Sequence, residues 1–154
     1  MSIQLVRIDD RLIHGQVVTG WVNEYGIEQI IIVNDKLVND SVQKSVLMMT
    51  APANVKVHVF GVGQFNNIVK KNPIKKQTML LFSNPIDVHD VHQNGLPLES
   101  VNVGGIRYNE TRNNRLSKAV SVTDQEKAAL DAMIADGVDV FIQMVPKDKK
   151  ETLS

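Results

Sequence analysis

Short apolar runs, rich in valine and isoleucine, recur at fairly even intervals along this chain of 154 residues. Several of them, such as the run at 28–33, are almost continuously apolar rather than alternating. Strands that are covered on both faces, as in a parallel sheet, have this character. The runs that we expect to form strands are residues 3–8, 28–33, 55–60, 78–83, 100–105, 118–122 and 138–145.

The segments between these runs have the spacing of amphipathic helices. In the clearest of them, Thr123 and Glu126 fit a capping box, and Gly137 follows the last turn, where glycine is favoured. Strands that alternate with helices require right-handed crossovers. The sequence therefore predicts an α/β fold: an open, mostly parallel twisted sheet of about seven strands with helices on both faces, in a single domain over residues 1–154. The expected helices are residues 15–26, 39–52, 63–72, 85–95 and 123–137.

Two segments depart from this alternation. The first, residues 104–117, is polar, lacks a helical period and carries Arg107, Arg112 and Arg115. Loops longer than about 12 residues without regular structure are usually functional or mobile, so we expect this one to contribute to binding. The second is the charged tail at residues 146–154, which we expect to be frayed.

The composition excludes several classes of function. The chain has no cysteine, so it forms no disulfide and no thiolate metal site. Its 17 basic and 17 acidic residues cancel, which leaves no broad positive surface for nucleic acid or an anionic membrane. Apolar runs such as QIIIV fall far short of the ~20 residues that span a bilayer, and the N-terminus lacks the pattern of a signal peptide. We therefore expect a cytoplasmic protein without direct membrane insertion.

The segment RIDDRLIHGQ stands where the first strand gives way to the first helix. In open α/β sheets, ligands bind beyond the carboxyl ends of the strands, and a helix N-terminus attracts phosphate. His14 could carry a phosphoryl group on a ring nitrogen there, with Arg11 supplying positive charge as a planar fork. Asp9 or Asp10 could orient the imidazole or hold Arg11, and Gly15 would let the backbone approach closely. An ordinary helix cap beside a surface ion pair would contain the same residue types, so the cluster alone leaves both interpretations open.

The same stretch, extended to RIDDRLIHGQVVTGW, closely resembles the active-site segment of the enzyme IIB subunits in the mannose, fructose and sorbose family of the phosphoenolpyruvate-dependent sugar phosphotransferase system. Later segments resemble the corresponding family segments in the same order, so the resemblance covers essentially the whole chain. These segments are IIVNDKLVNDSVQKSVLMMTAP, VKVHVFGVGQF, LLFSNPIDV, VNVGGIRYNETRNNRLSKAVSVT and GVDVFIQMVP.

This resemblance implies a phosphoryl carrier. In that family the histidine of the RLIHGQ motif, His14 here, takes a phosphoryl group from a phosphohistidine on the IIA partner, and the resemblance suggests Nδ1 as the ring nitrogen. The histidine then passes the group to a sugar bound in the membrane components IIC and IID. The family fold is an open, mostly parallel sheet flanked by helices, which agrees with the fold that the pattern predicts.

Roles for the residues around His14 follow from these arguments. Arg11 and Asp10 are expected to assist at the catalytic histidine. Ser83 and Arg107 follow the fourth and fifth expected strands, so they lie beside His14 if the first strand is central. No cofactor, bound metal or nucleic acid is expected. The residues expected to bind phosphate are Gly15, Gln16, Ser83 and Arg107, and those expected to contact a partner are Arg112 and Arg115.

Two other kinds of protein remain compatible with the residues themselves. A regulatory domain that binds a nucleotide or sugar phosphate without covalent chemistry would use the same anion-binding loop. A histidine-dependent phosphatase would need a donor acid near His14 and would turn over alone. His89 and His92 are spaced as metal ligands on a helix, but no third ligand stands near them, so a solvated helix face is the better explanation.

Overall fold

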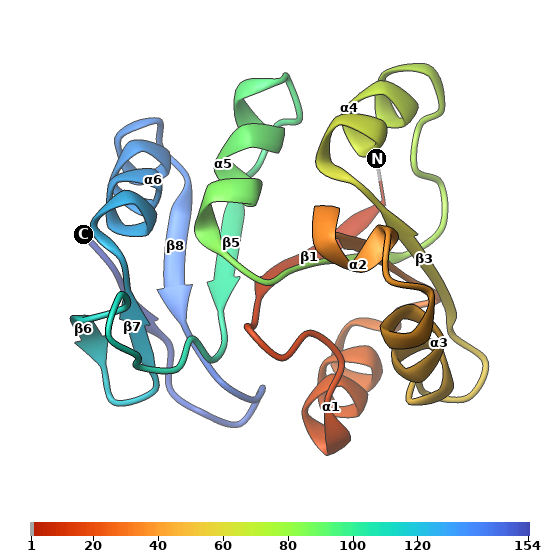
Figure 1. Cartoon of the computed structure of the whole chain (residues 1–154), viewed down its shortest axis with the longest axis horizontal. Helices are drawn as coiled ribbons and strands as arrows, with labels where there is room; N and C mark the ends of the chain where they lie inside the picture. The colour runs from red at the N-terminus through yellow and green to blue at the C-terminus, as the bar shows by residue number, and fades with distance from the viewer. Residues whose placement is uncertain (1) are drawn as a thin grey trace.

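A seven-stranded sheet in the order β3-β2-β4-β1-β5-β8-β9 forms the centre of the computed structural model, which describes residues 2–154 (Figure 1). Neighbouring strands run parallel except at the edge, where β9 is antiparallel to β8. A separate antiparallel hairpin consists of β6 and β7. The strands are β1 (Ile3–Ile8), β2 (Gln29–Val33), β3 (Lys56–Phe60), β4 (Thr78–Phe82), β5 (Ser100–Val103), β6 (Asn114–Ser117), β7 (Val120–Val122), β8 (Asp139–Ile142) and β9 (Glu151–Thr152). The helices are α1 (Gly15–Tyr25), α2 (Asp35–Val38), α3 (Ser41–Met49), α4 (Val62–Lys71), α5 (Pro85–Gln93) and α6 (Asp124–Ala135).

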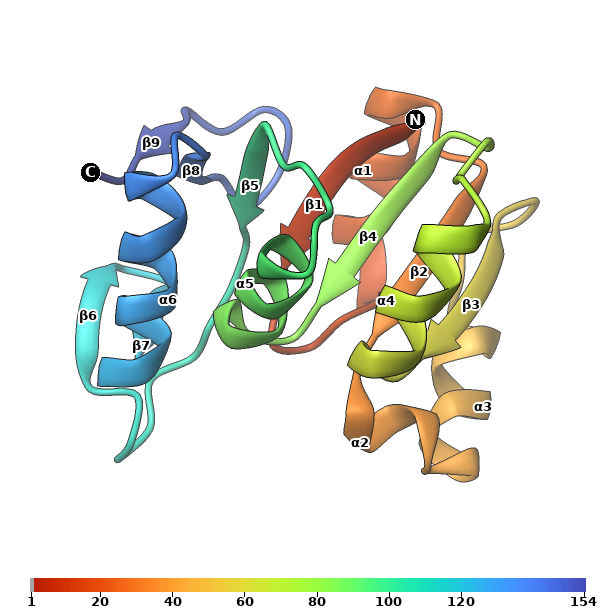
Figure 2. The same ribbon diagram turned by 90° about the horizontal axis from the view of Figure 1, so that it is seen from above.

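Both faces of the central strands are buried, as the nearly continuous apolar runs predict. Alternate residues of β2 point to opposite sides, because Ile31 and Val33 join one core cluster while Ile30 and Ile32 join the other. Helices α4, α5 and α6 contribute to the first cluster, and α1 and α2 contribute to the second. Figure 2 shows β1, β4 and β2 side by side, with α4 and α5 on one side and α1 on the other. The predicted fold class is confirmed.

The strand order places a switch point beside β1. After β1 the chain passes through α1 to β2, toward the β3 edge of the sheet. After β5 it continues to β8, toward the opposite edge. The loops that follow β1 and β5 therefore diverge, and a crevice opens between them at the carboxyl ends of the strands. The sheet topology thus puts the RIDDRLIHGQ segment where open α/β proteins bind their ligands.

A buried arginine fastens three strands together at this end of the sheet. Arg7 of β1 is fully buried and donates hydrogen bonds to the side chain of Asn102 on β5. It also donates to the carbonyl oxygens of Gln143 (3.2 Å) and Met144 (3.1 Å), which follow β8. At Gly104 the chain passes so close that an added Cβ would overlap the guanidinium of Arg7. A glycine is therefore required where β5 ends.

The expected helices and most of the expected strands lie where the sequence places them. The capping box of α6 is present, since the Thr123 hydroxyl accepts from the N–H of Glu126 and the Glu126 carboxylate accepts from the N–H of Thr123. The short helix α2 was not expected. It begins after Asn34, whose side chain accepts a hydrogen bond from the N–H of Leu37.

Three expectations for the second half of the chain are wrong. The run at 118–122 does not join the main sheet, because its β7 pairs with β6 in the hairpin. The segment at 104–117 is not wholly irregular, since it contains β6. The tail is not frayed at its end: β9 pairs with β8, and the N–H of Leu153 donates to the carbonyl oxygen of Val140 (2.8 Å). Backbone pairing needs no particular side chains, so a charged tail can cover the open edge of β8.

Replacing Gly104 with alanine is expected to lower the free energy of unfolding by about 1–3 kcal/mol, because overpacking forces the buried guanidinium of Arg7 to move. Gly63→Ala is the control, since nothing lies within 4 Å of the Cβ that it adds, and because Gly63 lies in α4 this variant should be at least as stable as the wild type. Urea denaturation of both variants measures the difference. Equal stability of the two would contradict the close approach at Gly104.

Candidate functional site

The loop from Asp9 to His14 leaves β1 and turns directly into α1. The N–H of Leu12 donates to the carbonyl oxygen of Asp9 (3.0 Å), and Leu12 has a φ of 57°. A bulky side chain rarely adopts this left-handed conformation, which costs about 1–3 kcal/mol. Leu12 and Ile13 are nevertheless buried in the core beneath α1. Their packing holds the loop in a shape that its backbone alone would not favour.

His14 is the N-cap residue of α1 and faces a buried carboxylate. Its Nε2 lies 2.9 Å from Oδ2 of Asp9, and the side chains of His14 and Asp9 are 18% and 1% exposed. A carboxylate accepts hydrogen bonds, so this contact favours the tautomer that carries its proton on Nε2. In that tautomer Nδ1 keeps its lone pair. In this geometry Nδ1, rather than Nε2, is the ring nitrogen that could act as a nucleophile.

Asp9 is itself held from two further directions. Its Oδ2 accepts from Nη2 of Arg7 (3.1 Å), and its Oδ1 accepts from the backbone N–H of Arg11 (3.1 Å). Burial lowers the pKa of Arg7, while the charge and the hydrogen bond of Asp9 oppose that shift. An arginine nonetheless stays protonated in a protein, so Arg7 and Asp9 form a buried ion pair. His14 contacts the Asp9 carboxylate of this pair from the more exposed side.

The second aspartate of the motif turns away from the histidine. Oδ2 of Asp10 accepts from the backbone N–H of Arg107 (3.0 Å) and from its Nε (2.8 Å). The Asp10 carboxylate raises the pKa of Arg107 through this hydrogen bond and through its charge. The carboxylate that orients His14 is thus Asp9, whereas Asp10 ties the loop after β1 to the segment after β5.

The sequence contained a signal for this difference. Arg7 and Asp9 are two residues apart at the end of an extended strand, so their side chains point to the same side of the sheet, and Asp10 points to the other. Arg7 itself was not among the expected site residues. Its partners come from β5 and the loop after β8, which are distant in the sequence.

The two arginines expected to contact a partner have different environments. Arg112 makes a bidentate pair with the buried carboxylate of Glu126, at 3.0 Å from Nε and 2.9 Å from Nη2. Its Nη1 also lies 4.0 Å from Oδ2 of Asp10. Arg112 therefore anchors the polar segment to the start of α6. Arg115 is exposed on β6.

Two hollows flank Arg11, which lines both of them. The first, of about 230 Å³, is rich in cations and is called the basic hollow below. Arg107 and Arg115 line it together with Lys118, which the sequence analysis did not single out. The second, of about 380 Å³, is called the α3 hollow and contains Ser83 and Lys36. The hydroxyl of Ser83 accepts a hydrogen bond from the Asn34 side chain (2.9 Å). The structure thus brings Arg107 and Ser83 to either side of Arg11.

The start of α1 lies next to these groups. Gly15 is exposed with a φ of 51°, and Gln16 is exposed beside it. The first turn of α1 carries no acidic residue, and the His14 side chain makes no capping hydrogen bond. The N–H groups of this turn have no intrahelical acceptors, so they can bind an anion.

Two features bear on metal ions and membranes. Across residues 2–154, no three histidine, aspartate or glutamate side chains are grouped as metal ligands. His92, which has metal-ligand spacing from His89, has its Nε2 3.5 Å from Oδ2 of Asp136. In the same part of the chain, no helix combines the length and apolar character needed to cross a bilayer.

Known proteins share both the sequence and the fold of this chain. A family model described as PTS system sorbose subfamily IIB component matches residues 3–154. The fructose-specific EIIB component of Bacillus subtilis (strain 168) is 36% identical over 152 residues, which are 98% of this chain and 93% of that protein. The mannose-specific EIIAB component of Escherichia coli (strain K12) is 38% identical over 152 residues, which are 97% of this chain and 46% of that protein.

A solved structure supports the same relationship. The IIB domain of the sorbose permease from Klebsiella pneumoniae superposes with a TM-score of 0.91 at 35% identity, covering 97% of this chain and 92% of that one. The resemblance that rests on the RIDDRLIHGQVVTGW segment is confirmed. The chain belongs to the sorbose subfamily of phosphotransferase-system IIB components.

Proposed function

We propose that this protein is a cytoplasmic phosphoryl carrier that works through Nδ1 of His14. It accepts the phosphoryl group from a phosphohistidine of a IIA protein and passes it to a sugar bound in the membrane components IIC and IID. The observation that carries this proposal is the 2.9 Å contact between Nε2 of His14 and Oδ2 of Asp9. That contact leaves Nδ1 as the nitrogen with a free lone pair. A relative that contains EIIA and EIIB in one chain, the mannose-specific EIIAB component, supports the choice of a IIA partner.

The transfer step leaves a positive charge on the imidazole ring of His14. The lone pair of Nδ1 attacks phosphorus, a P–N bond forms to His14, and the P–N bond to the donor histidine breaks. His14 then carries a proton on Nε2 and a phosphoryl group on Nδ1, so its ring is cationic. The Asp9 carboxylate lies at hydrogen-bond distance from that proton and stabilises the cationic ring. When the phosphoryl group moves on to a sugar hydroxyl, the O–P bond forms and the P–N bond to His14 breaks. The hydroxyl proton passes to a base or water at the sugar site, and the ring returns to its neutral form.

The phosphoryl group needs donors and positive charge around its oxygens. It brings up to about two negative charges to the loop. Arg11 supplies a guanidinium, and Gly15 and Gln16 supply N–H groups from the start of α1. Arg107 and Ser83, one in each hollow beside Arg11, are the further phosphate-binding residues of the proposal. No metal or cofactor takes part in this step.

His14→Ala is expected to abolish phosphorylation, because within residues 2–154 no other histidine lies beside a buried carboxylate at a helix start. The protein is incubated with phosphoenolpyruvate, the general phosphotransferase proteins and candidate IIA partners, and the modified residue is mapped. An acid-labile, base-stable phosphate on His14 supports the proposal, and His89→Ala should still carry it. Phosphate on His58, His89 or His92, or only reversible binding of a nucleotide or sugar phosphate, would overturn it.

Asp9→Asn is expected to slow single-turnover transfer from phospho-IIA by about 10²- to 10⁴-fold, because the ring loses its carboxylate partner. It should also reduce the free energy of unfolding by up to about 3–5 kcal/mol, since Arg7 keeps a buried charge without its counterion. Asp10→Asn is the neighbouring comparison and should have the smaller effect on both quantities, because its partner Arg107 is exposed. A larger transfer defect in Asp10→Asn would return the orienting role to Asp10.

Arg11→Gln is expected to slow transfer by about 10²- to 10³-fold with little change in stability. The Arg11 side chain is exposed and makes no hydrogen bond or ion pair within residues 2–154, so its loss removes no structural contact. Arg11→Lys keeps the charge without the fork and should be intermediate. Thermal unfolding and single-turnover transfer are measured for each variant. Near-normal transfer by a folded Arg11→Gln protein would remove Arg11 from the site.

A further inference from the structure

Helix α3 exposes an unusual amount of apolar surface. None of its nine residues is buried, although the helix carries Val42, Val46, Met48 and Met49. Their exposed fractions include 68% at Val42, 49% at Val46 and 85% at Met49. Apart from these four, the large apolar residues exposed within residues 2–154 are Ile86 and Tyr108. Clustered apolar exposure of this kind marks an interaction surface.

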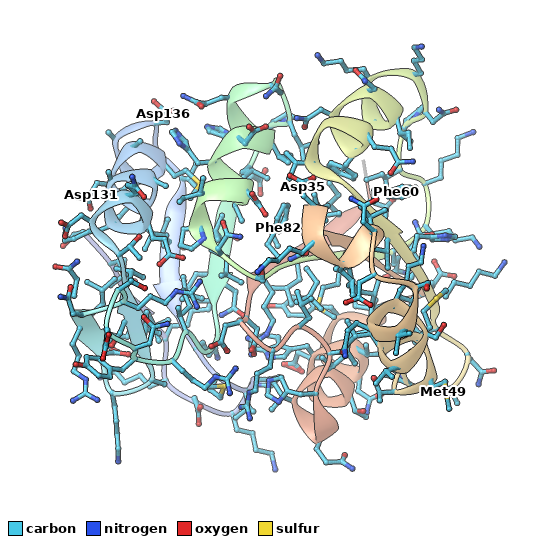
Figure 3. The ribbon with its side chains drawn as sticks, viewed as in Figure 1. Asp35, Met49, Phe60, Phe82, Asp131 and Asp136 are labelled. Atoms are coloured by element: carbon cyan, nitrogen blue, oxygen red, sulfur yellow. The ribbon has the colours of Figure 1, made fainter. Side chains whose placement is uncertain are left out.

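Three of these side chains lie along one line of the helix. Val42, Val46 and Met49 are spaced i, i+4 and i+7, so they form a stripe, named the α3 stripe here. Leu47, on another side of the helix, is half-buried and packs against the core beneath α1. Figure 3 shows the labelled Met49 at the outer end of α3. Leu47 and the α3 stripe thus point in different directions, and the stripe faces away from the protein.

Helix α3, which carries the stripe on another of its sides, borders the phosphoryl site. Gln43 and Leu47 of α3 line the α3 hollow together with Arg11 and Ser83. A specific protein interface covers about 800 Å² on each partner, which is far more than one histidine and its loop. A protein that reaches His14 must therefore also cover neighbouring surface, and the exposed apolar residues there are those of α3 together with Tyr108 in the basic hollow.

The other flank of Arg11 is cationic. Arg107, Arg115 and Lys118 line the basic hollow, where Asp10 is the one carboxylate and is already paired with Arg107. A donor protein arrives with the negative charge of its phosphoryl group, which these cations attract. After transfer the same charge rests on His14 and offsets the cations. The attraction is therefore strongest for the phosphorylated donor.

We infer that the α3 stripe is the apolar part of the docking face for the phosphoryl donor protein. The donor lays an apolar patch on Val42, Val46 and Met49, while its phosphohistidine reaches His14 beside Arg11. This inference rests on the proposed function, because it takes the donor from it. A second copy of the chain has no net negative charge to offer the cations of the basic hollow, so a phosphorylated donor is the better occupant.

The test replaces Val42, Val46 and Met49 together with glutamine, which keeps the helix and removes the apolar stripe. Ile86→Gln is the matched control, since Ile86 is 43% exposed on α5, whose core residues pack on the opposite face of the sheet. Single-turnover transfer is measured over a range of phospho-IIA concentrations. The half-saturating donor concentration should rise about 10-fold or more in the triple variant, with the rate at saturation within about twofold of the wild type. The control should match the wild type.

Three further measurements assign the occupant. Binding of IIA is titrated directly on a His14→Ala background, so weaker binding by the triple variant supports the docking face even if phosphate maps to another residue. Phosphorylated triple variant should still pass its phosphoryl group to sugar through IIC and IID at the wild-type rate. Unchanged donor binding, or a defect confined to the membrane step, would overturn the inference. The inference would also be overturned if the wild type sedimented as a dimer and the triple variant as a monomer. That result would assign the stripe to self-association.

Discussion

One carboxylate oxygen, Oδ2 of Asp9, links the buried Arg7, which connects the strands, to His14 of the candidate site. It accepts from Arg7 on one side and lies at hydrogen-bond distance from His14 on the other. A buried ion pair is tolerated only where its hydrogen-bonding groups are largely satisfied, and Arg7 meets this need by donating to side-chain and backbone oxygens of β5 and of the loop after β8. The carboxylate that contacts the histidine is therefore held by β1, β5 and the loop after β8, and not only by the loop that carries His14. The indole of Trp21 adds to this arrangement, since the Arg7 guanidinium lies 5.3 Å from its ring centre and Trp21 donates to the carbonyl oxygen of Met144.

Rigidity at this end of the sheet matters for the proposed function, in which a phosphoryl group is passed between proteins. Leu12 keeps its left-handed backbone because Leu12 and Ile13 are packed beneath α1. Asp10 binds Arg107, and Arg112 binds Glu126, so the polar segment after β5 is tied to both the loop after β1 and the start of α6. Donors and charges that are already in place lose little energy to rearrangement when negative charge arrives. Arg11 and Arg115, whose side chains make no hydrogen bond or ion pair within residues 2–154, line the hollows.

Most of the fold could be predicted, because the spacing of apolar residues along the chain determines where strands and helices form. The parallel strands and the capped helix after Thr123 follow from spacing alone, and the motif around His14 identifies the site. What could not be predicted depends on partners far away in the sequence. The hydrogen-bond partners of Arg7 come from β5 and the loop after β8, the hairpin takes β7 from the main sheet, and β9 covers the edge of β8 through backbone pairing. The α3 stripe is a related case, because helical spacing predicts an apolar face without showing whether the fold covers it.

The uncapped N-terminus of α1 affects how readily the helix frays. Its first turn has no side-chain cap and no acidic residue, so the helix begins with N–H groups that no carboxylate or hydroxyl satisfies. A phosphoryl group on the N-cap histidine is placed to act as the missing cap. The first turn of α1 should then fray less in the phosphorylated protein than in the free one, and amide hydrogen exchange there would slow as the phosphate arrives and recover as it leaves. The N–H groups that are proposed to bind the phosphoryl group would thus also couple its presence to the order of the helix.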